Sequence, residues 1–129
     1  MRVLLDTHTL LWAALNPERL SAKAKTLLTS LNTEAFVSAA SAWEIATKVR
    51  IGKLPGAGAF AADFPARIER MGFYGLAITL EHGQRAGLLP GGHKDPFDRM
   101  LIAQAFREGL TIVTHDKRFS DYNVAMLPT

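Results

Sequence analysis

Residues 2–15, RVLLDTHTLLWAAL, hold the pattern that decides the fold of this 129-residue chain. Arg2–Leu5 is a short apolar run that ends at Asp6, and apolar residues then recur at helical spacing as far as Leu15. Such a run predicts a buried strand, and the spacing after it predicts a helix. The chain therefore begins with a strand that leads into a helix, with a carboxylate at the junction.

The same alternation of strand and helix continues along the chain. Further strands are expected over Ala35–Ser38, Tyr74–Leu80, Leu110–Val113 and Val124–Leu127. Further helices are expected after Ser21 as N-cap, over Ala39–Ile51 before Gly52, over Phe60–Met71, and from Asp95-Pro96 to Gly109. This alternation predicts one α/β domain over residues 1–129, an α/β/α sandwich with a mainly parallel central sheet.

Composition narrows the classes of function. Lys and Arg (15) exceed Asp and Glu (12), and the net charge of +3 favours a polyanionic partner, although it equally fits a role in solubility alone. The chain has no cysteine, which excludes disulfides, thiolate metal sites and cysteine nucleophiles. We expect a cytoplasmic protein without a membrane segment, because the sequence starts unlike a signal peptide and no apolar run reaches transmembrane length.

Two acidic residues follow predicted strands. Asp6 follows the first strand, and Asp116 follows the run Leu110–Val113. The carboxyl ends of parallel strands share one edge of a sheet, and α/β proteins place their active sites there. The alternatives are a helix cap for Asp6 and a turn for Asp116. Because burial of a carboxylate is unfavourable without a cation or several donors, Asp6 favours the functional explanation.

Glu44 lies among small and apolar residues in the stretch AASAWEIA (39–46). We expect this helix to be largely buried, which makes a charge on it unusual. The alternative is a surface ion pair with Lys48, four residues further on, which would contribute about 0.3 to 0.5 kcal/mol. The apolar neighbours favour a functional carboxylate.

Two further acids lie three residues apart in HKDPFDR (93–99). Asp95 fits the N-cap position before Pro96. Asp98 falls in the first helical turn, where a negative charge interacts with the helix dipole by roughly 0.3 to 1 kcal/mol. One acid is enough for the cap, so we expect Asp95 to hold the turn while Asp98 faces the crevice.

Carboxylates that converge on one edge need a counter-ion. Pairs within about 4 Å repel by a few kcal/mol at an effective dielectric near 20, and a hard divalent cation removes that repulsion. Oxygen ligands favour Mg²⁺ or Mn²⁺. Trp12 and Trp43 are expected in the core or an interface rather than as nucleobase platforms, because each lies in an apolar helix. The histidines lack the paired spacing of a zinc site: His8, His82, His93 and His115.

With these motifs the chain resembles the PIN-domain ribonucleases, and within them the VapC-like toxins of toxin–antitoxin pairs. The resemblance runs nearly end to end and rests on four stretches together. They are LLDTHTLLW, VSAASAWEIATKVRIGKL, HKDPFDRMLIAQA and TIVTHDKRFSDY. The resemblance implies a PIN-like α/β/α sandwich and a metal-dependent endoribonuclease.

The resemblance also implies which residues form the site. Asp6, Glu44, Asp98 and Asp116 match the acidic positions of the family, with Asp6 and Asp98 as the direct metal ligands. Asp116 is placed by the spacing of Thr114-His115-Asp116 alone, as a direct or a water-mediated ligand. Supporting roles are expected for Thr7, Ser41, Asp95, Arg99 and Thr114.

The implied reaction is hydrolysis of RNA to products with a 5′-phosphate and a 3′-hydroxyl, in which Asp116 or Glu44 orients the attacking water. Implied partners are a second copy of the chain and a small antitoxin. Lys94 and Arg99 either contact phosphates or are solvated charges beside Asp95 and Asp98. The alternatives are an RNA-processing or DNA-acting nuclease of the same fold, and a noncatalytic interaction module.

Overall fold

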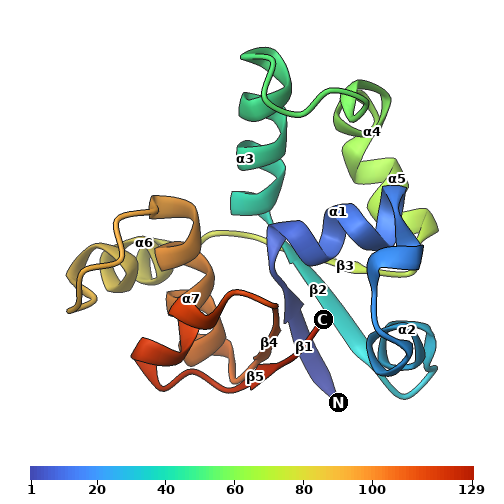
Figure 1. Cartoon of the computed structure of the whole chain (residues 1–129). Coiled ribbons are helices and arrows are strands. Elements are labelled where there is room, and N and C mark those ends of the chain that lie inside the picture. Colours follow the sequence, from blue (N-terminus) through green and yellow to red (C-terminus); the bar gives the residue numbers. More distant parts are fainter.

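Strand β1 (Arg2–Leu5) lies at the centre of the sheet in the computed structural model, which describes residues 1–129 (Figure 1). It pairs with β2 (Glu34–Ser38) on one side and with β4 (Thr111–Val113) on the other. Strands β3 (Tyr74–Leu76) and β5 (Met126–Leu127) form the two edges, giving the order β3-β2-β1-β4-β5. Every pairing is parallel, so the expected α/β fold is confirmed and its sheet is wholly parallel.

The side chains of β1 explain why its sequence is a continuous apolar run. Val3 and Leu5 enter one core cluster, while Leu4 enters a second cluster on the opposite face. A strand that is covered on both faces needs apolar side chains at successive positions. The sheet therefore lies between two layers of helices (Figure 1).

The two helical layers differ in composition (Figure 1). One layer carries the helices of the first half of the chain, and the other carries those of the second half. The first comprises α1 (Thr7–Leu15), η1 (Pro17–Arg19), α2 (Ala22–Thr29), α3 (Ala39–Arg50), α4 (Gly58–Ala62) and α5 (Phe64–Arg70). The second comprises α6 (Leu80–Leu88), α7 (Pro96–Glu108) and η2 (Lys117–Tyr122).

Helix boundaries follow the predicted capping residues in most cases. The Ser21 hydroxyl accepts a hydrogen bond from the Ala24 amide at 3.1 Å and caps α2. Asp95 caps α7 at its start, and Gly109 ends it in the left-handed conformation, with φ of 68°. Glycine adopts this conformation without steric penalty, so Gly109 is a suitable C-cap.

Two segments differ from the sequence prediction. The helix expected over Phe60–Met71 is two helices that meet at Asp63, because Pro65 fits the first turn of α5 and cannot continue α4. The strand expected over Tyr74–Leu80 ends at Leu76. Leu80 is the first residue of helix α6, which the periodicity did not predict.

A capping box explains the start of α6. The Thr79 hydroxyl accepts from the His82 amide at 3.1 Å, and the Thr79 amide donates to His82 Nδ1, also at 3.1 Å. Histidine takes the place of the usual Glu or Gln, so this start signal is hard to recognise from sequence.

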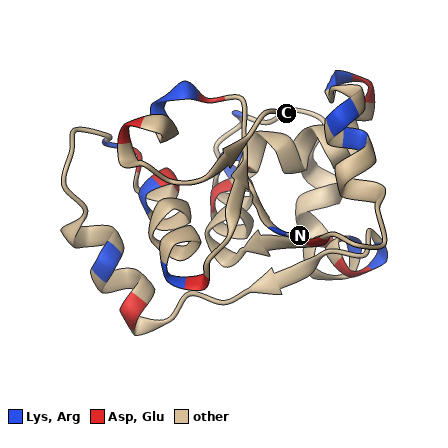
Figure 2. Ribbon diagram, turned by 90° about the horizontal axis from the view of Figure 1, so that it is seen from below, with Lys and Arg blue, Asp and Glu red and all other residues tan.

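Neither acidic nor basic residues dominate the chain. Figure 2 shows basic and acidic residues interspersed over the elements, which fits the small net charge of +3. The chain contains no helix with the length and apolar character that a membrane crossing requires.

The topology places the chain's acidic motifs at the carboxyl ends of the strands. After β1 the chain pairs β2 on one side, and it later returns to pair β4 on the other. Ligands of open parallel sheets bind beyond the carboxyl ends of the strands at such a reversal of strand order. Asp6 follows β1 and Asp116 follows β4, so both lie at this reversal.

Candidate active site

Asp6 occupies the N-cap position of α1 but does not cap the helix with its side chain. Its Oδ2 instead accepts a hydrogen bond of 2.7 Å from the buried hydroxyl of Thr114. Burial raises the pKa of Asp6, against the lowering effect of the Thr114 hydroxyl and the charge of His8. The capping alternative is therefore wrong, and the carboxyl is held inward toward the strand ends.

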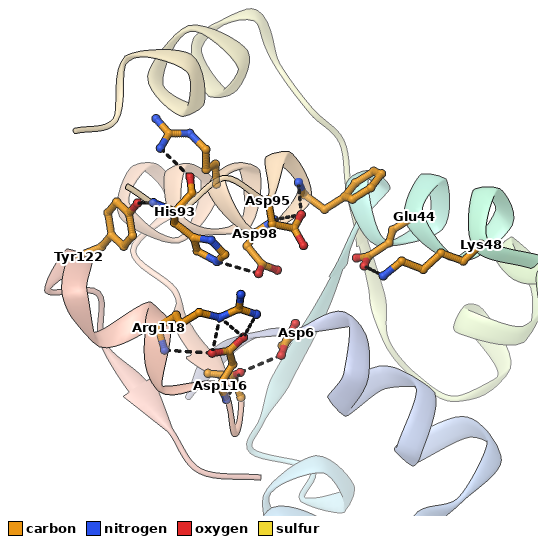
Figure 3. Close-up of polar contacts among 12 residues, drawn as sticks. Asp6, Glu44, Lys48, His93, Asp95, Asp98, Asp116, Arg118 and Tyr122 are labelled. Carbon is orange, nitrogen blue, oxygen red and sulfur yellow. Dashed lines mark hydrogen bonds and ion pairs between the residues drawn. The ribbon is translucent and has the colours of Figure 1, made fainter. Parts of the chain in front are cut away.

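Asp95 and Asp98 divide their duties as the sequence predicts. Asp95 Oδ1 accepts from the amides of Phe97 at 2.9 Å and Asp98 at 3.3 Å, and thereby caps α7. Asp98 is buried, and its Oδ2 shares a hydrogen bond of 2.8 Å with His93 Nε2 (Figure 3). Burial raises the pKa of Asp98 to about 8, and the nearby carboxylates of Asp95, Asp6, Glu44 and Asp116 add to the rise.

His93 is a site residue that the sequence analysis missed. Its ring is nearly buried, and its backbone amide donates to the Tyr122 hydroxyl at 3.1 Å. Phe119 lies at its edge, with ring centroids 6.3 Å apart. The sequence signal is the position of His93 at the head of the HKDPFD motif, five residues before Asp98.

Glu44 is buried although its helix is not. Its Oε2 pairs with Lys48 Nζ at 2.5 Å, while its Oε1 is buried and has no hydrogen-bond partner. The largely buried helix expected here is wrong, because Trp43 beside it is 63% exposed. Glu44 thus forms the ion pair of the alternative explanation, and it also retains an unsatisfied buried oxygen that a surface pair would not have.

Asp116 is held by Arg118, which the sequence analysis did not single out. The guanidinium contacts both carboxylate oxygens, with an Nη2–Oδ2 distance of 2.6 Å. Asp116 Oδ1 also accepts from the Arg118 amide at 2.9 Å and caps η2. The Arg118 side chain accordingly lowers the pKa of Asp116 to about 2. The alternative of a structural acid at a turn is therefore realised for Asp116.

Two hydroxyl contacts tie the surrounding elements together. Thr114 Oγ1 donates to Asp6 and accepts from the Asp116 amide at 3.0 Å, so it links two of the acids. Thr7 and Ser41 are both buried, and their hydroxyls lie 2.9 Å apart, which joins α1 to α3.

The two basic residues expected near the site have different surroundings. The guanidinium of Arg99 donates to the backbone carbonyls of Ala86, Leu89 and His93, so it supports the loop before α7. Arg99 is therefore not a solvated charge beside the acids, and a contact with phosphate stays a prediction. Lys94 is exposed and makes no hydrogen bond or ion pair.

Asp6, Asp98 and Asp116 face a common space, and Glu44 lies at its side with Lys48 (Figure 3). The three buried carboxylates share one pattern: a side chain of the protein binds one oxygen, and the second oxygen has no side-chain partner. These partners are Thr114 for Asp6, His93 for Asp98 and Lys48 for Glu44.

Carboxylates grouped around one space, each with an oxygen free of side-chain partners, fit a hard cation such as Mg²⁺ or Mn²⁺, which takes oxygen ligands. In the conformation of the structure, no three of the acidic or histidine side chains are placed to ligate one ion together. Cation binding by three of them together would therefore require these side chains to move.

Neither tryptophan lies in the core, so of the two expected locations, core or interface, only the interface stays a prediction. Trp43 is exposed and contacts Phe97 edge to face, with ring centroids 5.0 Å apart. Trp12 is half-buried and stacks on His115.

The fold and the site define an α/β protein with a wholly parallel sheet and a group of acids beyond the carboxyl ends of its strands. The sequence matches the model of the PIN domain over residues 3–125, and the chain belongs to the PIN domain family. The resemblance inferred from the motifs is confirmed at this level. A comparison with curated proteins gave no match.

Solved structures share the fold at low sequence identity. A chain of the VapBC2 complex from Rickettsia felis, bound to a promoter DNA fragment, is 16% identical, with a TM-score of 0.69 over 99% of this chain and 98% of that one. A chain of a Klebsiella pneumoniae toxin–antitoxin complex is 17% identical, with a TM-score of 0.67 and coverages of 97% and 95%. The Mycobacterium tuberculosis toxin VapC20, which cleaves the sarcin–ricin loop, is 20% identical, with a TM-score of 0.66 and coverages of 95% and 96%.

Proposed function

We propose that this chain is a divalent-cation-dependent endoribonuclease that acts as the toxin of a toxin–antitoxin pair. The observation that carries the proposal is the set of three buried carboxylates, Asp6, Glu44 and Asp98, each with one oxygen free of side-chain partners. A carboxyl whose pKa is raised to about 8 beside other acids is destabilising to a fold, and such groups concentrate at functional sites. Membership of the PIN domain family supports a catalytic role for these carboxylates.

In the proposed reaction, Asp6 and Asp98 hold Mg²⁺ or Mn²⁺ through their free oxygens. When bound, the cation supplies activation of water and neutralises charge on the phosphate. Glu44 Oε1 orients the attacking water, because it is the one buried oxygen with no partner in the protein. Asp116 has both oxygens on Arg118, so it contributes indirectly, and the exposed Arg118 guanidinium is available to a phosphate.

The resulting hydrolysis forms a bond between the water oxygen and phosphorus and breaks the bond to the 3′-oxygen. The products are a 5′-phosphate and a 3′-hydroxyl. His93 and Thr114 position Asp98 and Asp6 through single hydrogen bonds, so they act through the ligands and not on the substrate.

The choice of RNA and of a toxin role rests on the structures that share the fold. They are chains of toxin–antitoxin complexes, and one is a toxin that cleaves the sarcin–ricin loop. A homodimer and an antitoxin would also cover large apolar side chains that are exposed here. These are Trp43, Leu80, Leu88 and Phe106.

Cleavage by the purified chain tests the proposal. Labelled single-stranded RNA is incubated with the protein across a titration of Mg²⁺ and of Mn²⁺, and with EDTA. We expect cleavage that needs the cation and is lost in Asp98→Asn, while the exposed acid variant Asp121→Asn retains it. Cleavage in EDTA, or undiminished cleavage by a folded Asp98→Asn protein, would contradict the proposal.

The same assay separates the alternatives. A matched DNA strand that is cut as fast as RNA would favour a DNA-acting nuclease. Calorimetric titration with Mg²⁺ that shows neither binding nor turnover would favour a noncatalytic interaction module.

A further inference from the structure

Four side chains form a ring cluster on the surface beside the proposed site. The Trp12 and His115 rings stack, with centroids 4.8 Å apart and an interplanar angle of 18°. His8 meets His115 edge to face at 5.7 Å and 83°. The guanidinium carbon of Arg19 lies 5.0 Å from the centroid of the Trp12 ring. We call His8, Trp12, Arg19 and His115 the ring cluster.

The chain itself fixes the ring cluster next to the acids. His8 and Trp12 lie on the first turns of α1, which begins directly after Asp6. His115 directly precedes Asp116, at the end of β4. A phosphate held at the acids would therefore lie near the ring cluster.

Fold stability alone does not explain the ring cluster. A stack of aromatic rings stabilises a protein mainly through burial, but His8, Arg19 and His115 are exposed and only Trp12 is half-buried. None of the four side chains makes a hydrogen bond or a salt bridge within the chain. The cluster thus presents exposed ring surface, free ring nitrogens and a cation to solvent.

These properties match a nucleobase. Unpaired bases stack on aromatic rings and on guanidinium planes, and imidazole nitrogens can bind base edges. A base inside a duplex has both faces covered by its neighbours, so it can stack on a protein only after leaving the helix. An exposed stacking surface next to a phosphate site therefore selects for an unpaired nucleotide.

We propose that the ring cluster is a nucleobase subsite, in which an unpaired base adjacent to the scissile phosphate stacks on the His115 ring and meets the His8 ring at its edge. The inference rests on the proposed ribonuclease function and adds to it the requirement for an unpaired base at one position. Trp12 and Arg19 hold His115 from behind, since Trp12 stacks on His115 and Arg19 packs on Trp12.

The experiment measures binding of an end-labelled, unstructured oligoribonucleotide by fluorescence anisotropy in EDTA, which suppresses cleavage. A series of oligonucleotides carries one abasic site at each position in turn. Loss of one stacked base or of its platform weakens binding by roughly 5- to 100-fold. The variants are His115→Ala, His115→Phe, which keeps a stacking ring, and Tyr74→Ala, which removes an exposed aromatic ring from edge strand β3.

Coupling between the base and the residue is the decisive readout. We expect an abasic site at one position to weaken binding by the wild-type chain and to have no further effect in His115→Ala. His115→Phe should restore the sensitivity, and Tyr74→Ala should behave as wild type. Equal abasic penalties in wild type and His115→Ala at every position, or no RNA binding by the wild type, would overturn the proposal.

A parallel cleavage assay with Mg²⁺ keeps the two proposals apart. Coupling without cleavage would refute the ribonuclease and leave the ring cluster as an RNA-binding site. Cleavage without coupling would refute the ring cluster as a subsite and leave the ribonuclease in place.

Discussion

Replacing Asp98 by Asn should stabilise the cation-free protein, although Asp98 is the acid on which the proposed activity depends. The pKa of Asp98 is about 8 in the folded chain, against an ordinary value of 3.8. The folded state therefore binds more protons than the unfolded state between about pH 4 and pH 8, and stability falls as the pH rises through this window. The opposing free energy amounts to about 4 kcal/mol at pH 7.

Asn removes this ionisation and keeps the shape of the side chain. Its amide can still bond to His93, and little is lost there because a carboxyl with a pKa of about 8 is mostly protonated at pH 7. We expect Asp98→Asn to raise the free energy of unfolding in EDTA by about 2 to 4 kcal/mol at pH 7 and by close to zero near pH 4. Saturating Mg²⁺ should make the wild type the more stable of the two proteins. The cation is expected to bind the folded wild type and not Asp98→Asn, so it stabilises only the wild type.

Urea denaturation followed by circular dichroism, at several pH values with EDTA or Mg²⁺, measures these differences. Asp121→Asn is the matched control, since it makes the same substitution at an exposed acid. If Asp98→Asn lowered stability in EDTA at pH 7, or if its difference from wild type did not grow with pH, the reasoning from a buried, repelled carboxyl would be refuted.

Three further changes probe the partners of the acids. Lys48→Met removes the ammonium that pairs with Glu44, so unfolding measurements in EDTA should show a loss of stability of about 1 to 3 kcal/mol. Mg²⁺ should reduce this loss, and an equal loss with and without Mg²⁺ would exclude Glu44 from the cation site. Arg118→Gln should raise the pKa of Asp116 from about 2 toward its ordinary value, which a carboxyl NMR titration measures, and an unchanged value would show that the pairing is absent in solution. Thr114→Val removes one donor to Asp6 and should lower stability by about 1 to 3 kcal/mol in EDTA, with rescue by Thr114→Ser; a loss that serine does not restore would implicate packing.

The parallel sheet could be predicted because each strand has a local signal. The run Arg2–Leu5 is buried on both faces, and its sequence is apolar at successive positions for that reason. The division of duties between Asp95 and Asp98 was also readable, because the N-cap position before Pro96 is a local feature. Helix α6 was missed because its start depends on a histidine in a box that Glu or Gln usually completes.

The hydrogen-bond partners of the acids could not be predicted from the sequence, because tertiary contacts bring them together. Thr114 and Asp6 are 108 positions apart in the chain, and no rule of sequence spacing predicts their hydrogen bond. His93 lies only five residues from Asp98, yet its orientation depends on Tyr122, which is 29 positions away. Arg118 was readable in principle, because it lies two residues after Asp116 and a turn brings such neighbours together.

The carboxylate oxygens that have no partner in the protein change the order of importance among the acidic residues. Asp95 and Asp116 have structural duties that use their oxygens, the first as a cap and the second as a cap and a partner of Arg118. Glu44 has an ion pair as well, but it alone keeps a buried oxygen with no hydrogen bond at all. A buried acceptor left unsatisfied opposes folding by about 1 to 3 kcal/mol. A packed helix would more readily have placed an apolar residue there, so Glu44 belongs with Asp6 and Asp98 in the centre of the proposed site, and Asp116 belongs at its edge.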